Sequence, residues 1–324
     1  MNFLLKYWGT LRRLRIAHYL NNLKHFNKLK NNRKLYQKSG IKKSVISSIS
    51  HEDFQGKTDN NSRPWLDKIK AKDKIIQNID FQYFNSEIKN QFLNWIDNGH
   101  MILKEFFPEE IIDQINSDVD EIIREEKLPF DYTNTRVMNC HKHSKTIKKT
   151  VRNEQLISLL NFVMSKKVKP FQTINFMRGS QVKAHSDSIH MTTEPLGYLI
   201  AIWVALEDIH PDSGPVFYHP ASHKLPYVMN NDFETGNTAF AVGDNYYENY
   251  TDYIEKIVAE KQLPKEEFVA KKGDVLVWHA NLLHGGSPVK NKALTRKSLV
   301  VHYFCEDVIC YHEITQRPAI IEEI

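Results

Sequence analysis

The chain has 324 residues and a mass of 38.0 kDa, and its net charge at pH 7 is +5. A chain of this length can bury a full core, which excludes small disulfide-stapled folds. Its three cysteines, Cys140, Cys305 and Cys310, lack the paired spacing of a zinc or redox motif, so we expect reduced thiols in a cytoplasmic protein. The longest apolar run, residues 198–206, is too short to span a membrane, and a signal peptide is not evident.

Basic charge is concentrated near the N-terminus. Twelve Lys and Arg residues lie between Lys6 and Lys43, and no Asp or Glu precedes Glu52. The rest of the chain has 32 basic and 39 acidic residues, a net charge of −7. The extension could contact an anionic surface, although a solvated basic tail is the simpler alternative.

The first 30 residues carry an apolar stripe with spacings of three and four, formed by Leu4, Trp8, Leu11 and Leu14. This stripe predicts an amphipathic helix, and the nearby Arg12, Arg13 and Arg15 suit a peripheral membrane contact through residues 1–30. Docking of the stripe on the protein body is the alternative. Residues 31–63 are polar and predict a linker. We therefore expect an extension at 1–63 and a domain at 64–324.

Helices come first in the body of the chain and strands follow. The apolar spacing predicts helices from Pro108 to Ile123 and from Glu154 to Met164. Short apolar runs predict strands at 171–177, 198–206, 215–218, 275–278 and 298–304. Strands without intervening crossover helices favour a mainly β fold with flanking helices (α+β), built on an antiparallel barrel or jelly roll. The polar, Tyr-rich residues 224–267 are interpreted as an insertion.

A candidate metal site combines His185 and Asp187 with the distant His284. In an extended segment, residues i and i+2 point to the same side, so the first two side chains can converge on one ion. Two His and one carboxylate on one face of an octahedron leave three positions open, as in non-haem iron(II) oxygenases. By ligand type alone, a zinc hydrolase with an open fourth position fits equally.

Arg296 begins the predicted strand at 298–304, twelve residues after His284. An Arg that enters a barrel needs a carboxylate partner, because a buried unpaired guanidinium is unfavourable. The distal carboxylate of 2-oxoglutarate is one such partner, held by two hydrogen bonds. An internal ion pair or exposure to solvent is the alternative.

Residues 99–304 resemble the phytanoyl-CoA dioxygenase family of iron(II)- and 2-oxoglutarate-dependent oxygenases. The resemblance rests on several motifs in the family's order: His185-Ser186-Asp187, residues 203–208, Ser213-Gly214-Pro215, residues 219–223, Gly273-Asp274, His284-Gly285-Gly286 and Arg296. It implies a double-stranded β-helix, the cupin-like jelly roll. The family's Pro-Gly-Ser-His turn is changed here to Pro220-Ala221-Ser222-His223, where we expect Ser222 and His223 to be structural.

The resemblance also implies site residues. His185, Asp187 and His284 would bind Fe(II), Arg296 would anchor 2-oxoglutarate, and Trp203, Gln172 and Asn175 would line the cosubstrate pocket. O2 would be the oxidant, 2-oxoglutarate would be decarboxylated to succinate, and an unactivated carbon of the substrate would be hydroxylated. The carboxylate of Asp187 favours hydroxylation over halogenation, because the related halogenases lack this ligand.

The partner implied is a small-molecule or lipid- or sugar-linked substrate. Two alternatives to the oxygenase are a cupin-type metal-dependent isomerase or hydrolase, which has no need for Arg296, and a non-catalytic binding module. Nucleic acid is not expected as a partner, because basic strands interleaved with aromatic residues are missing. His141 and His143 lie in a basic segment that is better suited to facing substrate than to binding metal. Residues 136–149 and the insertion at 224–267 are the predicted substrate lid.

Overall fold

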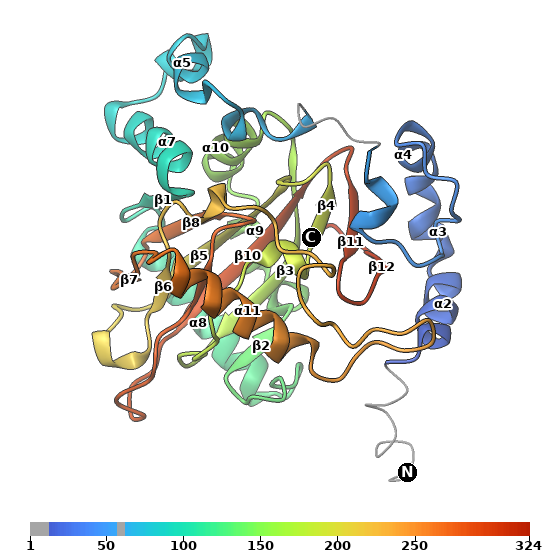
Figure 1. Cartoon of the computed structure of the whole chain (residues 1–324). Coiled ribbons are helices and arrows are strands. Elements are labelled where there is room, and N and C mark those ends of the chain that lie inside the picture. The colour runs from blue at the N-terminus through green and yellow to red at the C-terminus, as the bar shows by residue number, and fades with distance from the viewer. Residues whose placement is uncertain (1–12, 57–61) are drawn as a thin grey trace.

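The computed structural model describes residues 13–56 and 62–324. Its largest element is an antiparallel sheet of six strands in the order β1-β8-β5-β10-β3-β2 (Figure 1). These strands are β1 (His100–Leu103), β2 (Arg136–Met138), β3 (Val168–Phe176), β5 (Leu199–Ala205), β8 (Val275–His279) and β10 (Ser298–Cys305). All five strands predicted from the sequence are present, four of them in this sheet.

Two smaller antiparallel sheets complete the barrel. One has the order β7-β6-β9 and the other β12-β11-β4. Their strands are β4 (Thr192–Glu194), β6 (Val216–Tyr218), β7 (Glu266–Phe268), β9 (His284–Gly286), β11 (Ile309–His312) and β12 (Arg317–Pro318). Val216 and Tyr218 of β6 share a buried apolar cluster with Trp203 and Trp278 of the large sheet. Sheets that face each other across a common core form the predicted jelly roll, so this prediction is confirmed.

Strand β5 explains the longest apolar run of the sequence. Every residue of the strand is buried. Ile200, Ile202 and Val204 belong to the cluster shared with the helices, whereas Ala201 and Trp203 belong to the cluster inside the barrel. A strand covered on both faces has no polar side, and its sequence is therefore continuously apolar instead of alternating.

Helices cover the outer face of the large sheet. They include α7 (Ser86–Asn98), α8 (Glu109–Arg124), α9 (Lys145–Thr150) and α10 (Glu154–Met164), with α5 (Ala71–Ile76) and α6 (Ile79–Gln82) beside α7 (Figure 1). Helix α8 buries Ile112, Ile115, Val119 and Ile122, the face expected from their spacing. The predicted helices at 108–123 and 154–164 are confirmed. No helix among the described residues is long and apolar enough to cross a membrane.

The segment expected to be a linker is instead packed against the barrel. Helices α2 (Arg15–Lys24), α3 (Phe26–Leu29) and α4 (Arg33–Lys38) lie beside β11 and β12 (Figure 1). Downstream of them, Ile49 and Phe54 join Tyr36 in a buried cluster with Ile309 and Tyr311. The linker prediction is wrong because these apolar residues are scattered at irregular spacing among polar ones. The division at Pro64 stays a prediction, and Leu4, Trp8 and Leu11 lie outside the described residues.

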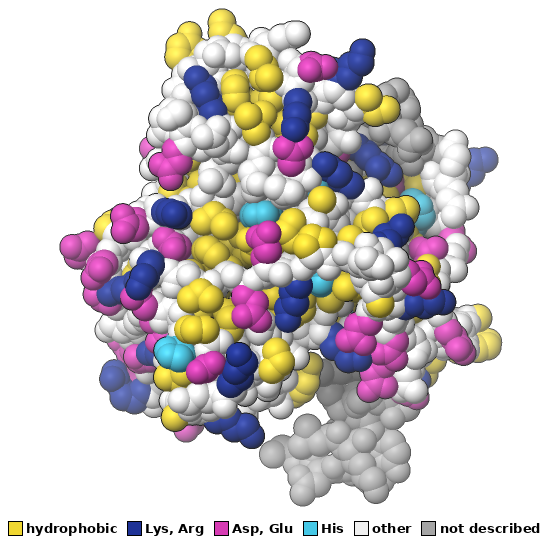
Figure 2. Space-filling model, turned by 60° about the vertical axis from the view of Figure 1, so that its left-hand side comes forward, with side chains coloured by type: hydrophobic (Ala, Val, Ile, Leu, Met, Phe, Trp, Pro, Cys, Tyr) yellow, Lys and Arg dark blue, Asp and Glu magenta, His cyan; other side chains and the backbone are white. Residues whose placement is uncertain are grey.

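The two predicted lid segments also contain regular structure. Residues 136–149 hold β2 and the start of α9, so this segment is not a simple loop. The insertion holds α11 (Tyr246–Glu260), which lies across the front of the barrel in Figure 1. On the face shown in Figure 2, acidic and basic side chains are intermixed, as expected for a body of nearly balanced charge.

Candidate active site

The two candidate ligand histidines are joined directly through their backbones. The His185 N–H donates to the His284 carbonyl at 3.0 Å, and the His284 N–H donates to the His185 carbonyl at 2.9 Å. This isolated antiparallel bridge places the two imidazoles 4.6 Å apart, centroid to centroid. The spacing of these side chains is therefore fixed by the strand pairing and not by side-chain contacts alone.

Both imidazoles are held in the form that can bind a metal. The Nδ1–H of His185 donates to the Lys183 carbonyl and that of His284 to the Leu282 carbonyl, each at 2.9 Å. A ring whose Nδ1 carries the proton presents the lone pair of Nε2 to the other side. Burial and the neighbouring His284 lower the pKa of His185 to about 3, which keeps it neutral at ordinary pH.

Asp187 completes the group. One ligand atom from each of His185, Asp187 and His284 lies within 4.8 Å of the others. The Asp187 Oδ2 accepts a hydrogen bond from Trp278 Nε1 at 2.7 Å, and His302 Nε2 lies 3.5 Å from the same oxygen. The Trp278 bond turns Oδ1 toward the histidines. Burial alone would raise the pKa of Asp187, but His284 and His302 outweigh it and hold that pKa well below its usual range.

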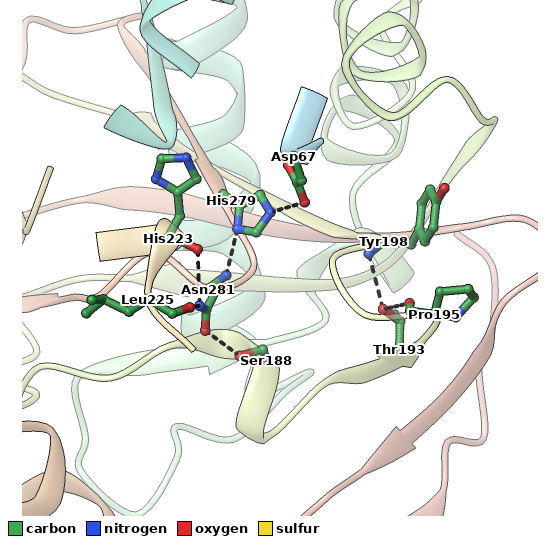
Figure 3. A network of polar contacts seen from close by, with 9 residues as sticks. All are labelled: Asp67, Ser188, Thr193, Pro195, Tyr198, His223, Leu225, His279 and Asn281. Atoms are coloured by element: carbon green, nitrogen blue, oxygen red, sulfur yellow. Dashed lines mark hydrogen bonds and ion pairs between the residues drawn. The ribbon is translucent and has the colours of Figure 1, made fainter. Parts of the chain in front are cut away.

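A polar network fixes the loop before His284 (Figure 3). Asn281 donates through Nδ2 to the carbonyls of His223 and Leu225, and its Oδ1 accepts from Ser188 Oγ at 3.4 Å. Its backbone N–H donates to His279 Nδ1, so His279 donates through Nε2 to Asp67 at 3.0 Å. The network connects the turn after Asp187 to the loop that carries the third ligand.

A cavity of about 630 Å³ opens beside these ligand atoms, with Arg296 in its wall. Arg296 is only 2% exposed and lies 5.0 Å from the ring of Phe176 and 5.6 Å from that of Trp203. Its Nη1 donates to Ser298 Oγ at 2.6 Å. Burial lowers the pKa of Arg296 to about 10, so the guanidinium is still charged at neutral pH.

The polar atoms around Arg296 fit a missing dianion. Arg296 Nε and Trp203 Nε1 are buried and have no hydrogen-bond partner within residues 13–56 and 62–324. The two alternatives for Arg296 were exposure to solvent and an internal ion pair. Arg296 is not exposed, and no described carboxylate forms an ion pair with it. A buried cation with free donors facing a cavity is strongly unfavourable unless an anion enters. The carboxylate of 2-oxoglutarate fits this position, and the donor set of His185, Asp187 and His284 fits Fe(II).

The sequence also matches the model of a known family. The phytanoyl-CoA dioxygenase (PhyH) model covers residues 95–298, well over half of the chain. The chain belongs to the phytanoyl-CoA dioxygenase family. The predicted family is thereby confirmed.

Curated relatives are distant. Phytanoyl-CoA dioxygenase domain-containing protein 1 of Danio rerio is 27% identical over 106 residues, which cover 33% of each chain. The peroxisomal phytanoyl-CoA dioxygenase of Homo sapiens is 21% identical over 235 residues, or 65% of this chain and 66% of that protein. The chain thus matches about a third of the first relative and just under two thirds of the second.

Solved structures with the same fold have low sequence identity. The non-heme alpha-ketoglutarate-dependent carbocyclase SnoK from nogalamycin biosynthesis has a TM-score of 0.56 at 12% identity, covering 70% of this chain and 87% of its own. EctD from S. alaskensis with 2-oxoglutarate and 5-hydroxyectoine has a TM-score of 0.53 at 14% identity, covering 69% and 78%. At these identities the likeness establishes the jelly-roll fold.

Two predicted pocket residues are not where the family pattern suggested. Asn175 pairs with Leu299, which belongs to the buried cluster shared with the helices. Asn175 lies on the opposite face of β3 from Ile174, so its side chain does not line the metal cavity. Gln172 lies on the same face of β3 as Ile174, but it lines a neighbouring cavity further along the strand. Single-residue register decides which face a strand residue occupies, and the sequence alone does not fix it.

Some residues of the site were not predicted. Ser298 contacts Arg296, Trp278 and His302 contact Asp187, and Tyr250 of α11 accepts the Ser186 N–H at 3.0 Å. Ser298 had a usable signal, because it lies two residues after Arg296 on the same strand. The others come from distant segments and have no local motif.

Proposed function

We propose that this chain is an iron(II)- and 2-oxoglutarate-dependent dioxygenase that uses O2 to hydroxylate an unactivated carbon of its substrate, releasing succinate and CO2. The observation that carries the proposal is Arg296, a buried cation that forms no ion pair with any described carboxylate and lies in the wall of the cavity that His185, Asp187 and His284 also line. Family membership supports the same conclusion.

The protein would supply three functions around the bound groups. His185, Asp187 and His284 would hold Fe(II), with Trp278 orienting the carboxylate of Asp187. Arg296 and Ser298 would bind the distal carboxylate of 2-oxoglutarate, and the rings of Phe176 and Trp203 would exclude water from it. The bound iron and cosubstrate together supply the activation of O2.

The first test is metal content. His185→Ala combined with His284→Ala should abolish stoichiometric iron binding, measured by elemental analysis, because one remaining ligand cannot retain a labile divalent ion. His210→Ala is a matched control, since His210 is exposed and does not belong to the ligand cluster. Full iron occupancy in the double variant would contradict the assignment.

The second test is turnover. Wild-type protein with Fe(II) should convert 2-oxoglutarate to succinate in a reaction that consumes O2 and is accelerated by the true substrate. A metal-dependent isomerase or hydrolase of cupin type would have no 2-oxoglutarate requirement. A non-catalytic binding module would neither consume O2 nor form succinate. Arg296 disfavours both alternatives, because neither provides an anion for this buried cation.

The cellular setting is also part of the proposal. All three cysteines are buried and unpaired, which supports a cytoplasmic protein. Peripheral membrane contact is supported by α2, which exposes Ile16, Tyr19, Leu20 and Leu23, an apolar stripe with spacings of three, one and three. The substrate would be a small molecule or a lipid- or sugar-linked molecule, and α11 with residues 136–149 would form the lid over it.

A further inference from the structure

A second cavity, of about 800 Å³, adjoins the metal cavity. His190 lines both cavities. Along β3, Ile174 faces the metal cavity and Gln172 faces the second one, and Gln172 pairs across the sheet with His302 of the metal cavity. The second cavity therefore begins where the metal cavity ends, on the same face of the barrel.

Cationic side chains outnumber acidic ones in the wall of this second cavity. They are Lys142, Lys145, Lys148 and Arg317, and the lining acids are Glu322 and Glu323. Glu322 pairs with Lys28 and Lys142, and Glu323 pairs with Arg152 and Lys169. No described acid pairs with Lys145, Lys148 or Arg317. The cavity thus retains an excess of positive charge after its internal ion pairs are formed.

Arg317 is the cation best placed to bind a ligand near the metal site. It is partly buried, and its Nε donates to Thr315 Oγ1 at 2.9 Å, which leaves the terminal nitrogens free of any hydrogen bond to the described residues. Burial lowers the pKa of Arg317, with Tyr246 of the lid helix acting in the opposite direction. A planar guanidinium fixed at Nε presents two parallel N–H groups, the geometry that binds phosphate and carboxylate oxygens.

A chain of rings leads from Arg317 toward the metal ligands. Arg317 pairs across the strands with His312, so their side chains are neighbours on one face. The ring of His312 lies 5.4 Å from that of His190, which lies 6.5 Å from that of His185. A single substrate molecule could therefore contact Arg317 at one end and approach the candidate metal ligand His185 at the other.

We propose that the second cavity binds a phosphate-type anionic group of the substrate through Arg317, with Lys145 and Lys148 at its rim. This inference rests on the proposed function and gives its substrate class: a molecule with an anionic group at one end and the carbon to be oxidised at the other. Arg296 remains the separate anchor of 2-oxoglutarate, because it lies in the wall of the metal cavity and not of the second one.

The test uses inorganic pyrophosphate as the probe, titrated calorimetrically into the full chain without iron or 2-oxoglutarate. Wild-type protein should bind saturably, Arg317→Gln should weaken binding at least tenfold, and the double variant Lys145→Gln, Lys148→Gln should weaken it severalfold. Arg124→Gln is the matched control, since Arg124 is exposed at the end of α8 and does not line this cavity. The lysines are exposed, so their variant tests the site even if Arg317→Gln fails to fold.

Absence of saturable binding by wild type, or equal binding by wild type and both cavity variants, would overturn the subsite. Iron and 2-oxoglutarate binding are measured on the same preparations. If these are normal while pyrophosphate binding fails, only the subsite is refuted. If they fail while pyrophosphate binds as described, the oxygenase proposal is refuted and the anion site stands.

Two further arms identify the source of the phosphate. Glycerol 3-phosphate represents a soluble ester, and vesicles of phosphatidylcholine with phosphatidic acid represent a lipid headgroup. Arg317→Gln should weaken the binding of whichever of these two ligands the wild-type protein binds. Binding in only the first arm assigns a soluble substrate, and Arg317-dependent binding in the second assigns a lipid-linked one. Binding in either arm that is insensitive to Arg317→Gln would contradict the proposal.

Discussion

Arg296 combines a large desolvation cost with an incomplete set of partners. Its guanidinium is stacked between Phe176 and Trp203, and among the described residues only Ser298 is hydrogen-bonded to it. The same features that make the residue unfavourable without an anionic partner make it specific for a dianion, because hydrogen bonds to charged groups strengthen where water is excluded.

We therefore predict that Arg296→Leu weakens 2-oxoglutarate binding by at least about thirtyfold and leaves iron affinity nearly unchanged. Removal of one partner of a buried charged pair costs about 2–5 kcal/mol. Calorimetric titration of 2-oxoglutarate with Mn(II) in place of iron measures both affinities. Arg296→Lys should restore binding only in part, because an ammonium lacks the planar pair of donors. Wild-type affinity in Arg296→Leu would refute the anchor.

The sequence predicted the candidate ligand set but not the residues that contact it, for a physical reason. His185 and Asp187 are neighbours within one extended segment, so local geometry brings them together. Trp278 reaches Asp187 from β8, which is 91 residues away. The pairing of such distant strands depends on packing of the whole barrel. Gln172 and Asn175 were misplaced for the same reason.

At the scale of elements, helix α11 is attached to the metal site and does not merely cover it. Tyr250 is fully buried, and its hydroxyl accepts the N–H of Ser186, the residue between two ligands. Lys183, just before His185, pairs with Asp252 and Glu255 of the same helix. Movement of helix α11 would therefore shift the segment that carries His185 and Asp187.

From this connection we predict that Tyr250→Phe weakens iron affinity about tenfold, the lower range for residues that orient metal ligands. The variant should also lose about 1 kcal/mol of unfolding free energy, the usual contribution of one hydrogen bond. Competition with a chelator measures the first quantity and urea unfolding the second. Tyr253→Phe is the control, because the Tyr253 hydroxyl bonds to no residue of the described chain. Similar losses in both variants would exclude a specific role for Tyr250.

Helix α2 presents its apolar stripe to solvent, with Ile16 61% and Leu20 58% exposed. No acid occurs in the sequence before Glu52, so the surroundings suit an anionic bilayer. A truncated chain beginning at Pro64 would be a poor test, because it would uncover Ile309 and Tyr311. Point substitutions on the exposed face avoid this problem.

We predict that Ile16→Gln, Leu20→Gln and Leu23→Gln together reduce co-sedimentation with phosphatidylglycerol vesicles severalfold, and that high salt reduces wild-type binding. The control variant replaces an equal number of exposed apolar residues elsewhere, Ile69, Ile76 and Ile79, with Gln. If neither wild type nor control sediments with vesicles, or if all three proteins sediment equally, the membrane contact is rejected.

Elements differed in how well their sequences defined them. Helix α10 was predicted with its observed bounds, because an apolar face and a capping Asn153 mark it locally. The short strands β4, β9 and β11, of three or four residues, carry too few side chains for a pattern. The segment at 31–63 was misinterpreted as a linker because its buried apolar residues, such as Tyr36, Ile49 and Phe54, follow neither the helical nor the strand period.

For the whole molecule, buried titratable groups couple stability to pH. Burial, with the neighbouring His279 and Lys224, lowers the pKa of His223 to about 2, and burial raises that of Glu313 to about 7. The unfolded chain takes up a proton on His223 as pH falls below about 6.5, whereas the folded protein does not. His223 therefore favours unfolding at acidic pH. Glu313 has the opposite effect on stability. Its folded-state pKa is about 7, so the folded protein takes up this proton at higher pH than the unfolded chain does, and acidification toward pH 5 favours folding.

We predict that His223→Asn removes about 2 kcal/mol of the stability difference between pH 7 and pH 5. Urea unfolding of metal-free protein at the two pH values measures it. Glu313→Gln should have the opposite effect and make stability fall more steeply on acidification. An unchanged pH dependence in both variants would contradict this assignment.

The backbone bridge between His185 and His284 has a consequence for iron supply. Proteins whose ligands are gathered only by the ion unfold when the metal is withdrawn. Here reciprocal peptide hydrogen bonds join the segments of the two candidate ligands directly. Iron starvation should thus leave an intact apoprotein that regains metal without refolding, and activity should return as fast as iron does, with no new synthesis of the protein.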